Sequence, residues 1–247
     1  MSKYNGWKNL PTLQFKEIIS ELEAAKDEQK NVMLIADTGL GKTNTIDLFK
    51  TKRNRHTYVV TLGDTYNLMA LLIDVQEMLG VKISRGKNEK HGAFKKIAER
   101  LKEFADAGDK PVIILDEAEN AKMPTLKAIK QLYDAIKGKC GIVLIGTEQL
   151  IFNLNKKSNG QSIPQLRRRF KAGTRYISPF NKQKDMRPFF NEFIPDQPDL
   201  QDLLIELCDN YGELNDYLDP FLRYCDRTGK PVSADLFRAY HKIPNRK

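Results

Sequence analysis

The chain has 247 residues, enough to bury a hydrophobic core as one large domain or as one domain with a small appendage. Its hydrophobic fraction of 40% and charged fraction of 30% are ordinary for a globular protein, and no apolar run approaches the ~20 residues needed to span a bilayer. The three cysteines and three histidines lack disulfide or metal-ligand spacing, and the N-terminus has no secretory pattern. We therefore expect a cytoplasmic protein without a membrane partner.

The net charge of +9 is unevenly distributed along the chain. Residues 151–181 contain seven Lys and Arg and no Asp or Glu, whereas acidic residues outnumber basic ones after residue 181. A basic central region favours a polyanionic partner such as nucleic acid. A solvated basic surface without any partner is the alternative that charge alone leaves open.

Strands alternate with helices in the pattern of the first 180 residues. Short apolar runs predict buried strands at residues 31–36, 57–62, 111–115 and 141–145, with a further strand near 175–177. Amphipathic patterns predict helices at residues 13–27, 66–79, 93–107, 124–136 and 165–171. A further helix is predicted after the glycine-containing segment that ends at residue 43, and it runs to residue 52. This alternation predicts an α/β fold with a parallel sheet sandwiched by helices.

Strand signals stop after Pro179, which predicts a second, helical part of the chain. Amphipathic patterns predict helices at residues 182–193, 200–210 and 214–227, and a short last helix at 233–241. We therefore expect an α/β domain over residues 1–180 and a small helical lid subdomain over residues 181–247.

The segment A-D-T-G-L-G-K-T, residues 36–43, lies between a predicted strand and a predicted helix. It matches the phosphate-loop pattern except that Ala36 replaces the first glycine, a mild change because that position needs a small residue. Gly39 and Gly41 can adopt backbone conformations in which N–H groups cradle phosphates, and a chance glycine-rich turn is the alternative. We expect Lys42 to bind the β and γ phosphates of ATP and Thr43 to bind Mg²⁺. The expected nucleotide-binding residues are Asp37, Thr38, Gly39, Leu40, Gly41, Lys42, Thr43 and Asn44.

Two adjacent acids, Asp116 and Glu117, end the strand predicted at residues 111–115. Asp116 is at the place expected for the second magnesium ligand, and Glu117 is expected to polarise the attacking water. The pair favours hydrolysis over phosphoryl transfer to a small molecule. Strand ends often carry acids for other reasons, which is the alternative.

Thr147 follows the next predicted strand, where a polar side chain could hold the attacking water or the γ-phosphate. A hydroxyl that caps a turn is the alternative interpretation. The segment Q-L-R-R-R-F, residues 165–170, is unusual because three consecutive arginines cannot all lie on one helical face. One of them is expected to project from the domain, either to stabilise charge at a neighbour's γ-phosphate or to form a basic surface patch.

The order of these motifs resembles the AAA+ ATPases: phosphate loop, strand with Asp-Glu, strand with a polar residue, arginine before an aromatic, and helical lid. Within that group, I-G-T-E-Q-L at residues 145–150 and L-R-R-R-F with I-S-P-F at residues 166–180 resemble transposition ATPases of the MuB and TnsC type. The resemblance covers about residues 12–240. It implies an ATP-bound homo-oligomer, a ring or a helical filament, which is wound around duplex DNA and recruits a transposase.

Carried over by position, Arg169 resembles the arginine finger because it directly precedes Phe170. The second-sensor arginine of the family has no equivalent near Gly229, where only Lys230 is available. The segment with Tyr4 and Trp7 corresponds to one that flanks adenine in relatives, and a hydrophobic anchor is the alternative.

From the same resemblance, we expect any DNA contact of this chain to come from the ATPase domain itself. The candidate contacts are cations and a hydroxyl in three loops, which suit phosphate binding without sequence information. They are Arg85, Lys87, Lys90, Lys122, Thr125, Lys156 and Lys157.

Three other functions compete with a transposition ATPase. A replication initiator or helicase loader has the same motifs, and a neighbouring transposase gene would distinguish the two. A P-loop enzyme without a DNA partner, such as a small-molecule kinase, is disfavoured by Asp116-Glu117 and the arginine run. A structural filament with vestigial hydrolysis is the third, and measured turnover would identify it.

Overall fold

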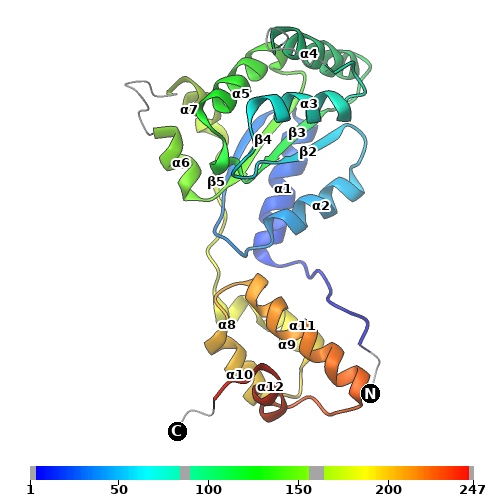
Figure 1. Ribbon diagram of the computed structural model, residues 1–247, viewed down its shortest axis with the longest axis vertical. Coiled ribbons are helices and arrows are strands. Elements are labelled where there is room, and N and C mark those ends of the chain that lie inside the picture. The colour runs from blue at the N-terminus through cyan, green and yellow to red at the C-terminus, as the bar shows by residue number, and fades with distance from the viewer. Residues whose placement is uncertain (1–3, 84–89, 156–163, 245–247) are drawn as a thin grey trace. The chain divides into compact units, whose positions relative to one another are not determined.

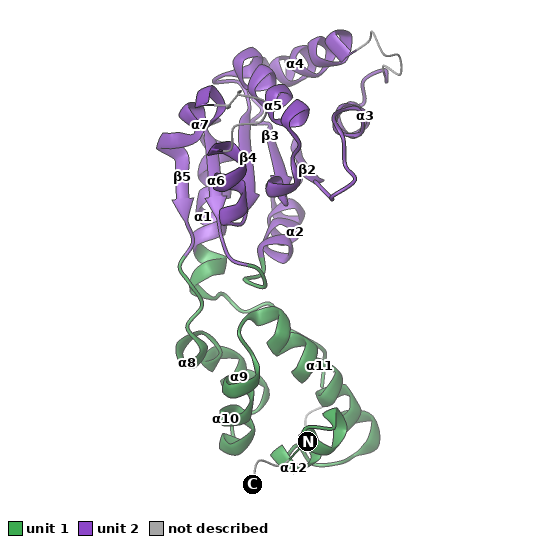
Figure 2. Cartoon of the chain, turned by 60° about the vertical axis from the view of Figure 1, so that its left-hand side comes forward, with its two compact units in different colours: residues 1–16, 38–41, 178–247 green, residues 17–37, 42–177 purple. Residues whose placement is uncertain are grey.

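The computed structural model describes residues 4–83, 90–155 and 164–244. Contacts divide the chain into two units, coloured separately in Figure 2. The helical unit comprises Met1–Lys16, Thr38–Gly41 and Ser178–Lys247, and the sheet unit comprises Glu17–Asp37 and Lys42–Ile177. The first 16 residues and residues 38–41 thus belong to the helical unit, although the sequence pattern predicts them in the α/β domain.

Five parallel strands form the sheet, as the sequence predicts. Their order is β2-β3-β4-β1-β5, so β4 lies between β1 and β3 (Figure 1). In the register, Ile35 pairs with Gly146 and Thr61 pairs with Asp116. The strands are β1 Asn31–Ile35, β2 Thr57–Thr61, β3 Val112–Asp116, β4 Gly141–Gly146 and β5 Thr174–Tyr176.

Helices flank the sheet and differ from the predicted ones mainly at two places. The helix α4 begins at Lys90 instead of Ala93, and an unpredicted helix, α6, begins directly after Thr147. The pattern of α6 was missed because only Leu150 and Leu154, one turn apart, are buried in it. The helices along the sheet part of the chain are α1 Leu13–Asp27, α2 Lys42–Lys52, α3 Leu68–Met78, α4 Lys90–Asp106, η1 Ala118–Asn120, α5 Met123–Ile136, α6 Glu148–Asn155, α7 Pro164–Phe170 and η2 Lys171–Gly173.

The sheet buries both faces, because successive strand residues point to opposite sides and both sets are apolar. Alternate residues such as Ile113 and Leu115 join one hydrophobic cluster with α3, α4 and α5. The other alternate set and the buried residues of α1 and α2 lie outside that cluster, which places α1 and α2 on the opposite face (Figure 1).

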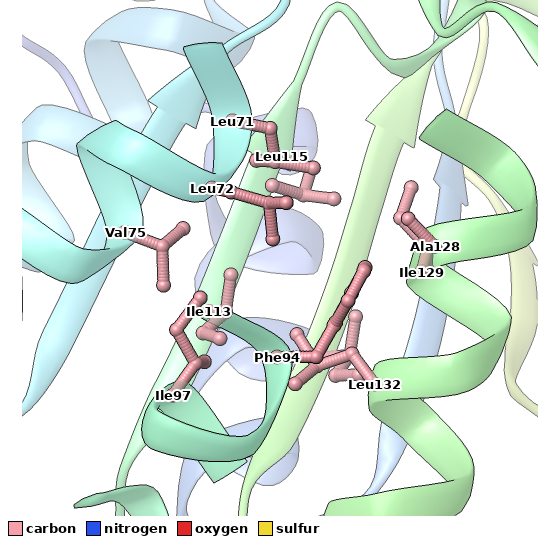
Figure 3. A pocket seen from close by; sticks show the side chains of 11 residues that line it. Leu71, Leu72, Val75, Phe94, Ile97, Ile113, Leu115, Ala128, Ile129 and Leu132 are labelled. Carbon is pink, nitrogen blue, oxygen red and sulfur yellow. The ribbon is translucent and has the colours of Figure 1, made fainter. Parts of the chain in front are cut away.

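A small cavity of about 20 Å³ lies in the larger cluster, between α3, α4, α5 and the sheet (Figure 3). Its lining is wholly apolar and includes Leu72, Val75, Phe94, Ile113 and Leu132. Because no polar group lines it, the cavity does not hold an ordered water, so it is a packing void instead of a binding site.

The helical unit contains one more break than the sequence predicts. A single helix is expected over residues 182–193, but the chain forms α8 Lys182–Asp185 and then α9 Arg187–Phe193. Pro188 explains the break, because it lacks an N–H donor and is tolerated only in the first turn of a helix. The other helices are α10 Pro198–Leu207, α11 Tyr211–Thr228 and α12 Ala234–His241. None of the helices in the described part of the chain is both long and apolar enough to cross a membrane.

The N-terminal segment packs within the helical unit through aromatic contacts. Trp7 stacks on Phe189 and Phe193, with ring centroids 5.1 Å away in each case. The Tyr4 hydroxyl donates a hydrogen bond of 2.6 Å to Asp219. These contacts correspond to the hydrophobic anchor, one of the two interpretations of this segment.

One buried cation, Lys26, ties α1 to the segments that precede β2 and β3. Its ammonium donates to the carbonyl oxygens of Arg55 at 2.6 Å, His56 at 3.4 Å and Lys110 at 2.8 Å. The residue is 5% exposed. Burial, with a further contribution from the charge of Arg53, lowers the pKa of Lys26 to about 8.

Replacing Lys26 with Met should lower the free energy of unfolding by about 2 kcal/mol or more, because three carbonyl oxygens lose their donor. Urea unfolding measures the loss. Lys16→Met is the control, since Lys16 is exposed on the same helix.

The same residue predicts a pH dependence. Between pH 8 and about 10.5 the unfolded chain keeps a proton on Lys26 that the folded chain has released. Stability should therefore rise with pH across that window in the wild type, and Lys26→Met should remove this rise. An equal rise in both proteins would contradict the assignment.

Candidate nucleotide-binding site

The phosphate-loop segment connects β1 to α2, as the sequence predicts. Gly39 and Gly41 have φ of +74° and +77°, in the left-handed region that favours glycine. A Cβ added at Gly41 would meet no atom within 4 Å, so the backbone conformation alone requires glycine there. The loop ends where α2 begins, and a helix N-terminus favours a bound phosphate.

Lys42 is the first residue of α2, and its ammonium is held by the backbone at the start of the loop. It donates to the carbonyl oxygens of Ala36 at 3.0 Å and Asp37 at 2.7 Å. Burial lowers the pKa of Lys42, while nearby carboxylates, Glu119 foremost, oppose that shift. An ammonium with a mobile four-carbon stem can exchange these carbonyls for phosphate oxygens.

Thr43 and Asp116 meet although they are 73 residues apart in the chain. The Thr43 hydroxyl donates a hydrogen bond of 2.7 Å to one Asp116 carboxylate oxygen, Oδ2. The other oxygen, Oδ1, accepts the backbone N–H of Glu117 at 2.9 Å, and Asp116 is 1% exposed. The structure therefore brings together the two predicted magnesium ligands.

This donor set fits Mg²⁺. A hydroxyl and a carboxylate are hard oxygen ligands, and Mg²⁺ usually takes one or two protein ligands together with phosphate oxygens and waters. Among the described residues no group of three or more His, Cys, Asp or Glu could hold a metal. Thr43 and Asp116 would hold the ion when nucleotide supplies further oxygens.

Glu117 lies next to Asp116 in an unusual backbone conformation. Its φ of +51° and ψ of +41° are left-handed, which is uncommon for a residue other than glycine. Its carboxylate is exposed, and Asn120 donates to it at 3.3 Å. Asn120 also donates to the Leu62 carbonyl oxygen at 2.8 Å, and so links Glu117 to the end of β2. Nothing in the sequence pattern singles out Asn120.

Thr147 lies at the same edge of the sheet, directly after β4. It is half-buried, and its carbonyl oxygen accepts the N–H of Leu150 in the first turn of α6. Its backbone therefore takes part in the first turn of α6, and the role of its hydroxyl, toward the attacking water or the γ-phosphate or as the cap of a turn, stays a prediction.

The three consecutive arginines have different surroundings in α7. Arg169 forms a two-point ion pair with Asp134 of α5, at 2.7 and 2.8 Å, and lies over the Tyr133 ring. Arg167 donates to Asn155 at 2.7 Å. Arg168 is exposed, and in the described part of the chain no hydrogen bond or ion pair engages its side chain. The Asp134 contact could not be predicted, because 35 residues separate it from Arg169.

Of the seven predicted DNA contacts, the structure describes three. Lys90 and Lys122 are exposed. Thr125 is 2% exposed, which corrects its prediction as a phosphate contact: it lies one turn before Ile129 on the buried face of α5. Arg85, Lys87, Lys156 and Lys157 lie outside the described residues.

Comparison with known proteins supports the fold. Residues 25–154, more than half of the chain, match the AAA domain family. A search of curated proteins finds no match. Domain III of the replication initiation protein DnaA from Thermotoga maritima is similar with a TM-score of 0.60 and 17% identity, over 96% of this chain and 93% of that one. A DNA replication initiation factor is similar with a TM-score of 0.55 and 15% identity, over 92% of this chain and 63% of that one. At these identities the likeness shows a shared fold alone.

The Lys42→Ala variant should lose at least tenfold in affinity for ADP and ATP, because the phosphates lose their cation. Fluorescence titration with a labelled nucleotide measures the loss. Lys50→Ala is the matched control, since Lys50 is exposed at the other end of α2. Equal losses in the two variants would show that Lys42 does not contact the phosphates.

Proposed function

The chain belongs to the AAA domain family, and from that premise we propose that it is an ATPase that assembles on duplex DNA. The observation that carries the nucleotide part is the hydrogen bond between Thr43 and Asp116, at the first turn of α2 and the end of β3. A hydroxyl and a buried carboxylate at this place, beside Lys42, suit Mg²⁺ bound to a triphosphate.

Each residue of the site then has a defined task. Lys42 exchanges its carbonyl partners for phosphate oxygens, and residues 37–44 hold the triphosphate through backbone N–H groups at the start of α2. Glu117 accepts a proton from the attacking water, and Thr147 orients that water or the γ-phosphate. Thr43 and Asp116 would hold Mg²⁺, which when bound would place positive charge beside the phosphate oxygens.

Hydrolysis in this proposal requires a second copy of the chain. Charge that develops on the γ-phosphate is stabilised by an arginine that arrives only on assembly. Arg169 is the first candidate, from its position before Phe170, and would have to leave Asp134 to reach a neighbour. Arg168 is the alternative, because it is exposed and no described residue holds its side chain.

The basic central region supports duplex DNA as the polyanionic partner. Lys90 and Lys122 are exposed cations on the sheet unit, and Arg85, Lys87, Lys156 and Lys157 are further candidates by sequence. Lysines contact phosphates without reading bases, so binding should be weakly sequence-specific. Assembly into a ring or filament would join these patches into one surface.

Presentation of target DNA to a transposase is the function that the sequence resemblance favours. A replication initiator or helicase loader is the second candidate, and the two similar solved structures, both described as replication initiation proteins, favour it. A direct test compares co-purification of the DNA-bound chain with a transposase and with a replicative helicase. Capture of only the helicase would contradict the transposition function.

Glu117→Gln should bind ATP and not hydrolyse it, because the group that takes the proton is lost while phosphate binding is retained. Arg169→Ala should also keep ATP binding and lose turnover by roughly a thousandfold. Mixing the two proteins should restore partial turnover, since the Arg169→Ala subunit has an intact Glu117 and takes an arginine from its neighbour. Phosphate release measures each rate.

The same mixing experiment with Arg168→Ala distinguishes the two arginines, and Arg167→Ala is the control within α7. If neither mixture regains turnover while the subunits still assemble, neither Arg168 nor Arg169 acts in trans. If all three variants hydrolyse ATP normally but bind DNA poorly, the run is a phosphate-contact patch.

DNA binding should need ATP and should weaken steeply with added salt, because cations that contact phosphates release counterions. The double variant Lys90→Ala, Lys122→Ala should bind all duplex sequences more weakly than the wild type, by about tenfold at moderate salt. Lys50→Ala, Lys102→Ala is the charge-matched control on exposed positions of α2 and α4. Normal binding by the first double variant would remove these lysines from the interface, and no ATP-dependent binding at all would favour a P-loop enzyme without DNA.

A further inference from the structure

Arg169 is held at more points than Arg167, the other arginine of α7 with a described partner. Its Nε and Nη2 atoms donate to the Asp134 carboxylate of α5 at 2.7 and 2.8 Å. Its Nη1 atom donates to the Gln165 carbonyl oxygen at 2.8 Å, and the guanidinium carbon lies 5.4 Å from the centre of the Tyr133 ring. The side chain is only 23% exposed, so the arginine proposed to act on another subunit is bound within its own.

The contact between Asp134 and Arg169 has the geometry of a strong ion pair on a fixed backbone. A planar carboxylate that meets a planar guanidinium at two points is among the strongest side-chain ion pairs. Phe170, the next residue, is fully buried, and its ring lies 6.5 Å from that of Tyr133 on α5. The backbone that carries Arg169 is therefore anchored, and a change of partner requires only that its side chain rotates.

Lys130 gives Asp134 a second cation. It lies one turn earlier on α5, and its ammonium is 3.7 Å from the Asp134 carboxylate. If Arg169 leaves, Lys130 stays beside that carboxylate, which is also exposed to water. The loss of an exposed ion pair has a small cost, and a terminal phosphate is itself a two-point acceptor for a guanidinium. The contact is therefore reversible: it holds Arg169, and a γ-phosphate can replace it.

We propose that Asp134 is a positioning residue that holds Arg169 in its own subunit until the γ-phosphate of a neighbouring subunit takes the guanidinium. This inference rests on the proposed role of Arg169 in trans. Asp134 and the neighbour's phosphate compete for one guanidinium, so the ion pair raises the protein concentration that hydrolysis requires. Lys130 acts in the opposite direction, because it competes with Arg169 for Asp134.

The test uses an equal mixture of Glu117→Gln and Arg169→Ala subunits with ATP, Mg²⁺ and duplex DNA. The quantity measured is the protein concentration at which phosphate release is half-maximal. Only the Glu117→Gln subunit can donate Arg169 in this mixture. Adding Asp134→Asn to that subunit should lower the half-maximal concentration by roughly two- to fivefold, because the arginine has lost its partner. Adding Asp134→Asn to the Arg169→Ala subunit should change nothing, because that subunit has no arginine to release.

Asp106→Asn is the matched control for charge. It removes the same charge from an exposed carboxylate that pairs with Lys139 at 2.6 Å. In either subunit it should leave the half-maximal concentration unchanged, which separates release of Arg169 from a general effect of charge on DNA binding. Thermal unfolding of each variant shows whether the fold is kept.

Lys130→Ala tests the same competition with the opposite sign. In the Glu117→Gln subunit it should raise the half-maximal concentration by about twofold, because Asp134 then pairs with Arg169 alone. With Asp134→Asn already present, it should have no further effect. Lys95→Ala is its control, since Lys95 pairs with Glu99 at 3.8 Å, also one turn apart on an exposed helix face.

No shift from Asp134→Asn, or the same shift whichever subunit carries it, would overturn the holding role of Asp134. A lower half-maximal concentration with Lys130→Ala would contradict it as well. Failure of the proposed function gives a different result: the mixture of Glu117→Gln and Arg169→Ala would regain no turnover at any concentration, with or without Asp134→Asn, and the inference would be wrong together with it.

Discussion

The hydrogen bond between Thr43 and Asp116 is the contact on which the site depends, and the strand order makes it possible. Because β4 lies between β1 and β3, the start of α2 and the end of β3 can meet only across the end of β4. Gly146, the last residue of β4, has no side chain over that end of the strand, and Thr147 follows it directly. The parallel sheet thus collects a cation, a hydroxyl and several carboxylates at one edge, from segments that are far apart in the chain.

The buried face of each element limits what the exposed residues can do. In α5, Thr125 shares the buried face with Ile129, so its hydroxyl is unavailable to a partner although its neighbour Lys122 is exposed. In α7, Leu166 and Phe170 are buried one turn apart, which turns Arg167 and Arg168 outward and leaves Arg169 beside α5. The same amphipathic patterns that build the core therefore decide which cations can contact DNA or a neighbouring subunit.

Features that depend on local pattern were predictable, and those that depend on tertiary contact were not. The phosphate loop and Asp116 follow from short motifs at strand ends, and the parallel sheet follows from apolar runs alternating with helices. The Asp134 partner of Arg169, the Asn120 contact of Glu117 and the position of Glu119 over Gly146 depend on side chains that meet only after folding. Likewise, α6 is only two turns long and carries too few apolar residues to give a clear period.

The space above Gly146 limits which residues homologous chains can have at positions 146 and 119. A glycine there and a long carboxylate at position 119 fit each other, while a larger side chain at 146 would collide with that carboxylate. The two positions should therefore co-vary among homologues: a bulkier residue replaces the glycine only where residue 119 is short. Position 146 would then record, over evolutionary time, whether a relative has kept a long carboxylate at position 119.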